Sequence, residues 1–155
     1  MPNIELQPIG KVASTITGQR DDHWGSVTAE IHLDAARFHP EALVGLEEFS
    51  HVEILFALDQ VPESKIETGQ RHPRENPRWP KIGIFAQRGR SRPNRIGVTI
   101  CEIVSVSGLI LTVRGLDAFD GSPVLDIKPV IAEFLPDKAA LRQPQWAKEL
   151  MSTYF

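Results

Sequence analysis

Short strand-like segments recur along the chain at close intervals, and this spacing constrains the fold more than any other feature. Residues 26–33 alternate apolar and polar side chains, which is typical of a half-buried strand. Only residues 144–153 have the apolar spacing of a conventional helix. Further runs predict strands over 49–59, 81–87, 97–106, 109–113 and 124–130. Many short strands with few helices predict a mainly β protein, either a sandwich or a closed barrel.

The connections between these segments are short and carry turn residues. Pro40 opens a brief helical turn that Gly45 ends, and Ser107-Gly108 predicts a tight hairpin. Asp120-Gly121 predicts another turn ahead of the last strand. No repeat, low-complexity tract or linker divides the 155 residues, so we expect a single domain over 1–155.

Composition places the chain among ordinary globular proteins. Its hydrophobic fraction of 41% is ordinary for a folded protein. Its single cysteine fits a reducing compartment, and no segment is apolar over the length of a membrane span. We therefore expect a soluble, cytoplasmic protein. The five histidines lack metal-ligand spacing, so no metal site is expected. Cys101 and His51 both lie inside strand-like runs and are interpreted as packing residues.

Positive charge is concentrated in one segment of an acidic chain. Residues 71–95 hold eight cations against one acidic residue, a net charge of +7, whereas the remainder holds nine cations against 19 acids, a net charge of −10. Such segregation favours an anionic partner, since it focuses positive potential on one region. Seven of the eight cations are arginines, which pair in two-pronged fashion with phosphate and stack on bases. An arginine-rich solvated loop paired with acids elsewhere is the alternative.

The long polar run over residues 62–80 is the main irregular connection. A loop of this length in a compact domain is usually functional or disordered, and its arginines together with Trp79 favour function. Trp79 could stack on a splayed RNA base or anchor the loop on the barrel.

Two segments carry more specific residue patterns. Residues 83–97 place four arginines between two strands, with Gly89 and Gly97 permitting close approach of a ligand to the backbone. Residues 116–129 contain an exposed turn followed by Asp126 and Lys128 on one strand face, which by itself predicts an ordinary surface ion pair. Neither segment, nor any other, has the glycine pattern of a P-loop or Rossmann fingerprint.

These segments resemble the TrmO/YaeB-like family of tRNA N6-threonylcarbamoyladenosine methyltransferases. Four blocks match in order, namely Pro8-Ile9-Gly10 with a following strand, residues 45–56, residues 83–97 and residues 116–129. The resemblance covers about residues 8–136. It implies a single small closed β-barrel with a few short helices that binds S-adenosylmethionine (SAM) without a Rossmann fold. It further implies a homodimer, with SAM near the subunit interface, that methylates N6 of threonylcarbamoyladenosine at position 37 of tRNA.

The resemblance also assigns site residues by position. The cofactor set is expected to comprise Arg20, Asp21, Asp22, Leu58, Asp59, Arg88, Val98, Asp120, Gly121, Ser122 and Pro123. Asp59 and Asp126 are candidates for polarising or deprotonating the acceptor nitrogen. The tRNA-facing surface is expected to comprise Arg71, Arg74, Arg78, Trp79, Arg90, Arg92 and Arg95. No metal is expected.

Three positions depart from the usual family pattern. Gln87 and Ser122 each stand where threonine is usual, and Arg95 stands in place of a proline. The arginine adds charge where RNA would approach. Two alternatives therefore stay open: an enzyme of the same fold with another acceptor, and a non-catalytic barrel that binds RNA or another ligand.

Overall fold

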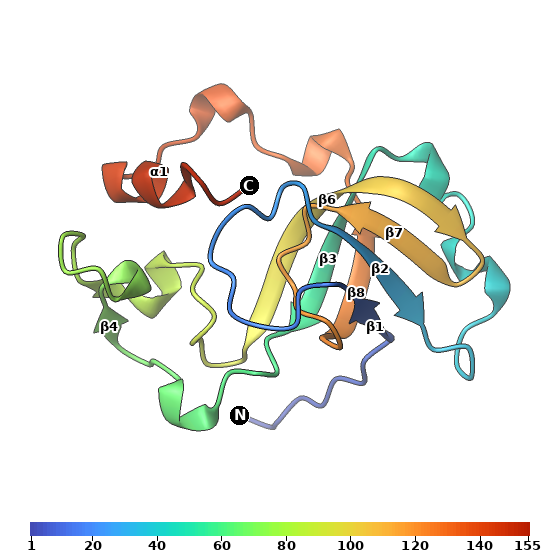
Figure 1. The fold of residues 1–155 in the computed structure, drawn as a ribbon, viewed down its shortest axis with the longest axis horizontal. Helices are drawn as coiled ribbons and strands as arrows, with labels where there is room; N and C mark the ends of the chain where they lie inside the picture. The colour runs from blue at the N-terminus through green and yellow to red at the C-terminus, as the bar shows by residue number, and fades with distance from the viewer.

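Six antiparallel strands close into one barrel in the computed structural model, which describes residues 1–155 (Figure 1). Neighbouring strands follow the order β1-β2-β7-β6-β3-β8, with β8 returning to β1. The barrel strands are β1 (Gly10–Ala13), β2 (Thr28–Leu33), β3 (His51–Ala57), β6 (Ile96–Ser107), β7 (Ile110–Arg114) and β8 (Pro123–Pro129). The predicted closed, mainly β architecture is confirmed.

The remaining elements are short. β4 (Gln70–Arg71) and β5 (Ile82–Gly83) form a separate two-stranded sheet, and α1 (Gln145–Met151) lies within the predicted helical segment. The 3-10 helices are η1 (Pro40–Leu43), η2 (Leu46–Glu48), η3 (Glu63–Lys65), η4 (Pro73–Glu75), η5 (Ile84–Ala86), η6 (Ala132–Phe134) and η7 (Lys138–Ala140).

Alternation along the strands fills the barrel. In β3 every second residue, Val52, Ile54 and Phe56, is buried, because successive strand side chains point to opposite faces. The partner strands add apolar side chains of the same alternation to one buried cluster. Leu43 and Leu46 from the 3-10 helices between β2 and β3 join this cluster. The interior is therefore a packed core.

Two sequence predictions are wrong. Residues 81–87 do not form a barrel strand: β5 has only two residues, and η5 follows because Ile84 turns inward and is 1% exposed. His51 is exposed at the start of β3, where its Nδ1 lies 2.8 Å from Ser50 Oγ. The alternation that buries Val52 turns His51 outward.

The thiol of Cys101 is buried in the core, as its strand position predicts. Burial raises its pKa to about 12, with a smaller contribution from the Asp117 carboxylate. Thiolate is the reactive form, so iodoacetamide at pH 8 should leave Cys101 unmodified in the folded protein and alkylate it in urea. Mass spectrometry would report both states, and alkylation of the folded protein at the rate of a free thiol would contradict the buried placement.

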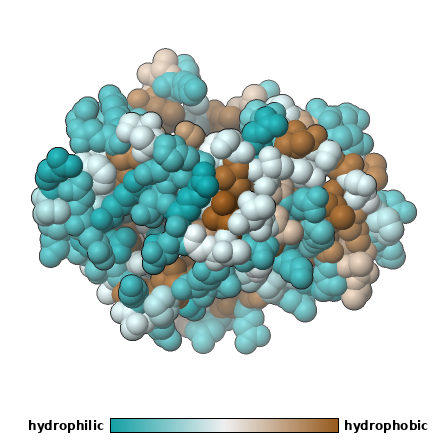
Figure 2. All heavy atoms as spheres, viewed as in Figure 1, coloured by the Kyte–Doolittle hydropathy of each residue, from teal (hydrophilic) through white to brown (hydrophobic).

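All long connections but one meet at one end of the barrel. There β1, β3 and β7 end and β2, β6 and β8 begin, so residues 14–27, 58–95 and 115–122 lie together. We call this end the barrel mouth. The opposite end carries the β6–β7 turn and the segment 34–50 (Figure 1). On the face shown in Figure 2, hydrophilic residues cover most of the side that carries the 58–95 segment.

Candidate functional site

The barrel mouth brings together residues that are far apart in the sequence. Every residue of the expected cofactor set lies in a connection at the mouth or at the start of β6 or β8. Asp59 is exposed two residues after the end of β3. Asp126 lies elsewhere, within β8, where it forms an ion pair with Lys128 that raises the pKa of the lysine.

The turn at residues 120–122 is bonded to the β1 end of the barrel. Gly121 has φ 80°, and its N–H donates to Val12 at 2.8 Å. The Asp120 N–H donates to the Ile16 carbonyl at 2.7 Å, and its carboxylate accepts from the Ser14 N–H at 3.0 Å. The carbonyls of Asp120 and Gly121 accept no hydrogen bond within the chain. This turn can therefore offer acceptors, but no free backbone donors, to a ligand.

Arg88 connects the cationic residues 71–95, which we call the arginine-rich segment, to the first residues of β6. Its side chain is exposed, and one guanidinium nitrogen donates to the carbonyl of Val98. The contact orients the arginine across the mouth while leaving its other donors available.

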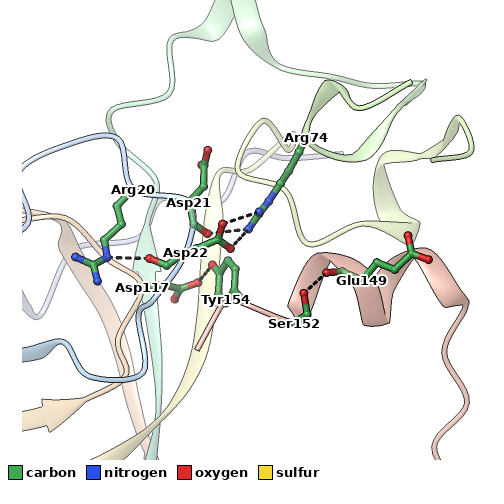
Figure 3. A network of polar contacts seen from close by, with 8 residues as sticks. All are labelled: Arg20, Asp21, Asp22, Arg74, Asp117, Glu149, Ser152 and Tyr154. Carbon is green, nitrogen blue, oxygen red and sulfur yellow. Dashed lines mark hydrogen bonds and ion pairs between the residues drawn. The ribbon is translucent and has the colours of Figure 1, made fainter. Parts of the chain in front are cut away.

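An ion pair joins two of the mouth connections (Figure 3). Arg74 donates to both carboxylate oxygens of Asp22, at 2.8 and 3.2 Å, and to the carbonyl of Asp21 at 2.7 Å. Arg20 donates from Nε to the carbonyl of Asp22 at 2.9 Å. The Arg74 hydrogen bonds hold the pKa of Asp22 below its usual range. The ion pair is thus kept at neutral pH and lost as pH falls through that lowered pKa.

The C-terminal residues complete the same network. Tyr154 donates its hydroxyl to one oxygen of Asp117, and Thr99 donates to the other. Burial raises the pKa of Tyr154, so the phenol stays protonated. The N–H groups of His23 and Trp24 donate to the carbonyls of residues 153 and 154, each at 2.8 Å. Figure 3 shows Tyr154 next to Asp22 and Asp117. We call Asp22, Arg74, Thr99, Asp117 and Tyr154 the clamp.

Sequence reasoning missed three members of the clamp, Thr99, Asp117 and Tyr154. Asp117 lies inside the 116–129 segment, but nothing in the sequence pairs it with a tyrosine 37 positions later. The one available signal is that Tyr154 is the only tyrosine of the chain.

Removing the Tyr154 hydroxyl should break its hydrogen bond to Asp117 while the aromatic ring stays in place. Tyr154→Phe is expected to lower the free energy of unfolding by about 1–2 kcal/mol, since a hydrogen bond to a carboxylate is lost from a half-buried position. Urea denaturation measures the change. Ser152→Ala, which removes an exposed hydrogen bond in the same segment, is the control and should cost about 0.5 kcal/mol or less. Equal stability of the two variants would contradict the clamp.

Two cavities lie outside the mouth. One, of about 410 Å³, is lined by residues of the 38–49 segment together with Ile9, Leu33, Asp126, Ile127 and Pro129. The other, of about 320 Å³, lies over β6 and η6 and includes Ile100, Phe134 and Leu135. Neither includes Arg88, Val98 or the 120–123 turn. Asp126 therefore belongs to a different surface from Asp59.

No group of three histidine, cysteine, aspartate or glutamate side chains is placed to hold a metal ion. None of the helices combines the length and apolarity that a membrane crossing requires.

A sequence profile described as the N-terminal domain of tRNA-methyltransferase O matches residues 19–135. The chain belongs to the TrmO family. It is 37% identical over 130 residues to a probable S-adenosyl-L-methionine-binding protein of Methanothermobacter thermautotrophicus, which covers 81% of this chain and 89% of that protein. It is 40% identical over 121 residues to a tRNA (adenine(37)-N6)-methyltransferase of Escherichia coli, covering 74% of this chain and 51% of the relative.

Solved structures agree with this membership. A crystal structure of TrmO from Pseudomonas aeruginosa superimposes with a TM-score of 0.74 at 28% identity, covering 94% of this chain and 62% of that one.

The mouse tRNA (adenine(37)-N6)-methyltransferase matches at 43% identity over 97 residues, which is 62% of this chain but only 22% of that protein. The chain thus spans widely different fractions of its relatives.

One departure from the usual TrmO pattern has a structural explanation. Arg95 has φ 50°, a value that proline cannot adopt because its ring fixes φ near −65°. Its side chain donates to the Val61 carbonyl at 3.0 Å, and its own carbonyl accepts from Leu58 at 2.7 Å. Arg95 therefore ties the segment after β3 to the start of β6.

Gln87, a second departure from the TrmO pattern, is likewise structural. It is 6% exposed, and its side-chain amide donates to the carbonyls of Arg71 and Ile82 at 3.0 and 2.9 Å. Gln87 thus links η5 to both strands of the β4–β5 sheet.

Four of the seven residues expected to face RNA, all except Arg71, Arg78 and Arg90, have hydrogen-bond partners inside the chain. Arg74 and Arg95 are held as described above, and Arg92 donates to the Gln87 carbonyl at 3.0 Å. The Trp79 indole N–H donates to Glu149 at 2.8 Å, and the Arg71 guanidinium lies against Gly89 with its Nε buried and unbonded. Exposed side chains without a partner remain at Arg78 and Arg90, and at Lys81 between them in the sequence.

Proposed function

We propose that the protein transfers a methyl group from SAM to N6 of threonylcarbamoyladenosine at position 37 of tRNA, with SAM held at the barrel mouth. The observation that carries this proposal is the convergence of the expected cofactor set on that one end. Membership of the TrmO family and the names of the E. coli and mouse relatives support the reaction class. A tRNA substrate would place the protein in the cytoplasm.

The residues at the mouth suit SAM, which carries a carboxylate together with two cationic centres. Arg88 is exposed and would hold the carboxylate. Asp21 is an exposed carboxylate without a side-chain partner and would hold the ammonium or the ribose hydroxyls. The unbonded carbonyls of Asp120 and Gly121 would accept from the remaining donors.

The chemistry then needs little from the protein beyond alignment. SAM supplies an electrophilic methyl group when bound. The mouth residues orient it against the acceptor nitrogen, and such positioning is a large part of the rate enhancement in group transfer. We assign Asp59, rather than Asp126, as the carboxylate that takes the N6 proton, because Asp59 is at the mouth and Asp126 is paired with Lys128 elsewhere.

A homodimer is part of the same proposal, with its interface on the barrel wall and not beside SAM at the mouth, where the resemblance implies it. Exposed apolar side chains gather on the outer face of β6 and on η6, where Ile100, Val104, Ile131, Phe134 and Leu135 are each at least 40% exposed. A patch of this kind suits a protein interface. Sedimentation velocity should give a dimer for the protein and a monomer for Phe134→Asp.

A second candidate is a methyltransferase of this fold with another acceptor. The changed backbone at Arg95 and the replacement at Gln87 favour it, since both lie in the arginine-rich segment beside the mouth.

Methyl transfer from labelled SAM to tRNA tests these proposals directly. We expect transfer to tRNA that carries threonylcarbamoyladenosine and none to the same tRNA without that modification. Transfer to both, or to another nucleotide, would support the second candidate. If the protein bound RNA but transferred no methyl group, the remaining interpretation would be a non-catalytic barrel that binds RNA. Asp59→Asn should lower kcat at least roughly 100-fold, and Asp126→Asn should change it less than roughly threefold.

A further inference from the structure

One large aromatic side chain in the arginine-rich segment is strongly exposed. Phe85 is 78% exposed, although phenylalanine is usually buried in a core. Trp79, the aromatic residue that the sequence offers for base stacking, is held by Glu149 and by the hydrogen bond between its carbonyl and His72 Nδ1 at 2.7 Å. Phe85 is therefore the aromatic side chain of this segment that is free to meet a partner.

The turn that presents Phe85 is firmly anchored. Ile84 is 1% exposed and its N–H donates to Gly69 at 2.9 Å, so the residue before Phe85 is fixed in the protein. Gln87 is 6% exposed and donates through its side chain to two carbonyls. The buried residues on both sides fix the backbone of η5. Binding a partner through Phe85 would therefore cost little backbone entropy.

The residues that flank Phe85 in the sequence are cationic. Lys81, Arg88 and Arg90 are exposed, and none of them forms an ion pair. No acidic residue occurs between positions 76 and 101. The centres of protein–protein interfaces are depleted in charge, whereas proteins that bind single-stranded nucleic acid combine a cationic surface with aromatic side chains. The composition around Phe85 matches the second class.

We propose that Phe85 is a stacking platform for an unpaired base of the RNA substrate, beside phosphates held by Lys81 and Arg90. The inference rests on the proposed function for the identity of the RNA. It adds a contact that positions an unstacked base at the edge of the arginine-rich segment.

The affinity of an anticodon stem-loop RNA, measured by fluorescence anisotropy, tests the platform. Phe85→Ala should weaken binding roughly tenfold, the order expected for loss of one stacked base, while Phe85→Tyr should stay within roughly twofold. Phe49→Ala, at the opposite end of the barrel, is the control and should also stay within roughly twofold. SAM affinity and sedimentation should be unchanged in all three variants.

Two results would overturn the inference alone. One is RNA binding by Phe85→Ala equal to that of the unaltered protein, which leaves the proposed function intact. The other is a change in sedimentation of Phe85→Ala, which would make Phe85 a contact between protein chains. Failure of the unaltered protein to bind RNA at all would overturn the platform and the proposed function together.

Discussion

Phe56→Ala is expected to lower the free energy of unfolding by about 3–5 kcal/mol, the usual range for truncating a buried aromatic side chain. Phe56 is 2% exposed in the middle of the core cluster. Its ring lies directly over Gly97 of the neighbouring strand, where an added Cβ would come within 2.5 Å of the Phe56 Cζ atom. Gly97 has no side chain that could move into the cavity left by the Phe56 ring. The truncated core therefore keeps most of that cavity.

Urea denaturation of two further variants separates cavity formation from other causes. Gly97→Ala should cost about 1–3 kcal/mol through overpacking against the same ring. Val44→Ala, at a 75% exposed position between η1 and η2, should change stability by about 0.5 kcal/mol or less. A loss for Phe56→Ala no larger than that for Val44→Ala would contradict the barrel packing.

Reversing the two free arginines is expected to have the largest effect on RNA binding. Arg78→Glu combined with Arg90→Glu should weaken tRNA affinity roughly 100-fold or more at low salt, because both side chains are exposed and unpaired. The slope of log affinity against log salt should fall by about two, one for each lost phosphate contact. Titrations at several salt concentrations measure both quantities.

The matched control changes the same number of charges outside the basic segment. Lys138→Glu with Arg142→Glu alters the net charge equally at exposed positions after β8. It should weaken tRNA binding by less than roughly fivefold and leave the salt slope unchanged. Equal losses in the two double variants would show that net charge, and not the location of Arg78 and Arg90, governs binding.

The sequence predicts most of the barrel because alternation decides which strand face is buried. β2, β3, β6, β7 and β8 all lie where apolar residues alternate or cluster, and the turn at Gly121 has the positive φ that glycine accepts readily. The same rule is insufficient for residues 81–87. There the apolar run is split between a two-residue strand and a turn by contacts with distant segments.

The candidate site likewise contains residues that local motifs indicate and residues that only tertiary contacts bring together. Local motifs indicate the 120–123 turn and Arg88, whereas the clamp depends on contacts across the whole chain. Arg74 meets an aspartate 52 positions earlier, and Tyr154 meets Asp117 only because residues 153 and 154 return to the barrel mouth. Charge counting likewise indicates a basic segment but cannot separate paired arginines from free ones, since the pairing is set by tertiary contacts.

Calorimetric titration of SAM into the purified protein tests the central claim, that the barrel mouth holds the cofactor. We expect binding in the micromolar range that Arg88→Ala weakens at least roughly tenfold, since a charged contact is removed, and that Asp126→Asn leaves unchanged. Absence of binding by the folded protein at millimolar SAM would contradict the account. Binding that Arg88→Ala leaves intact would move the cofactor away from the mouth.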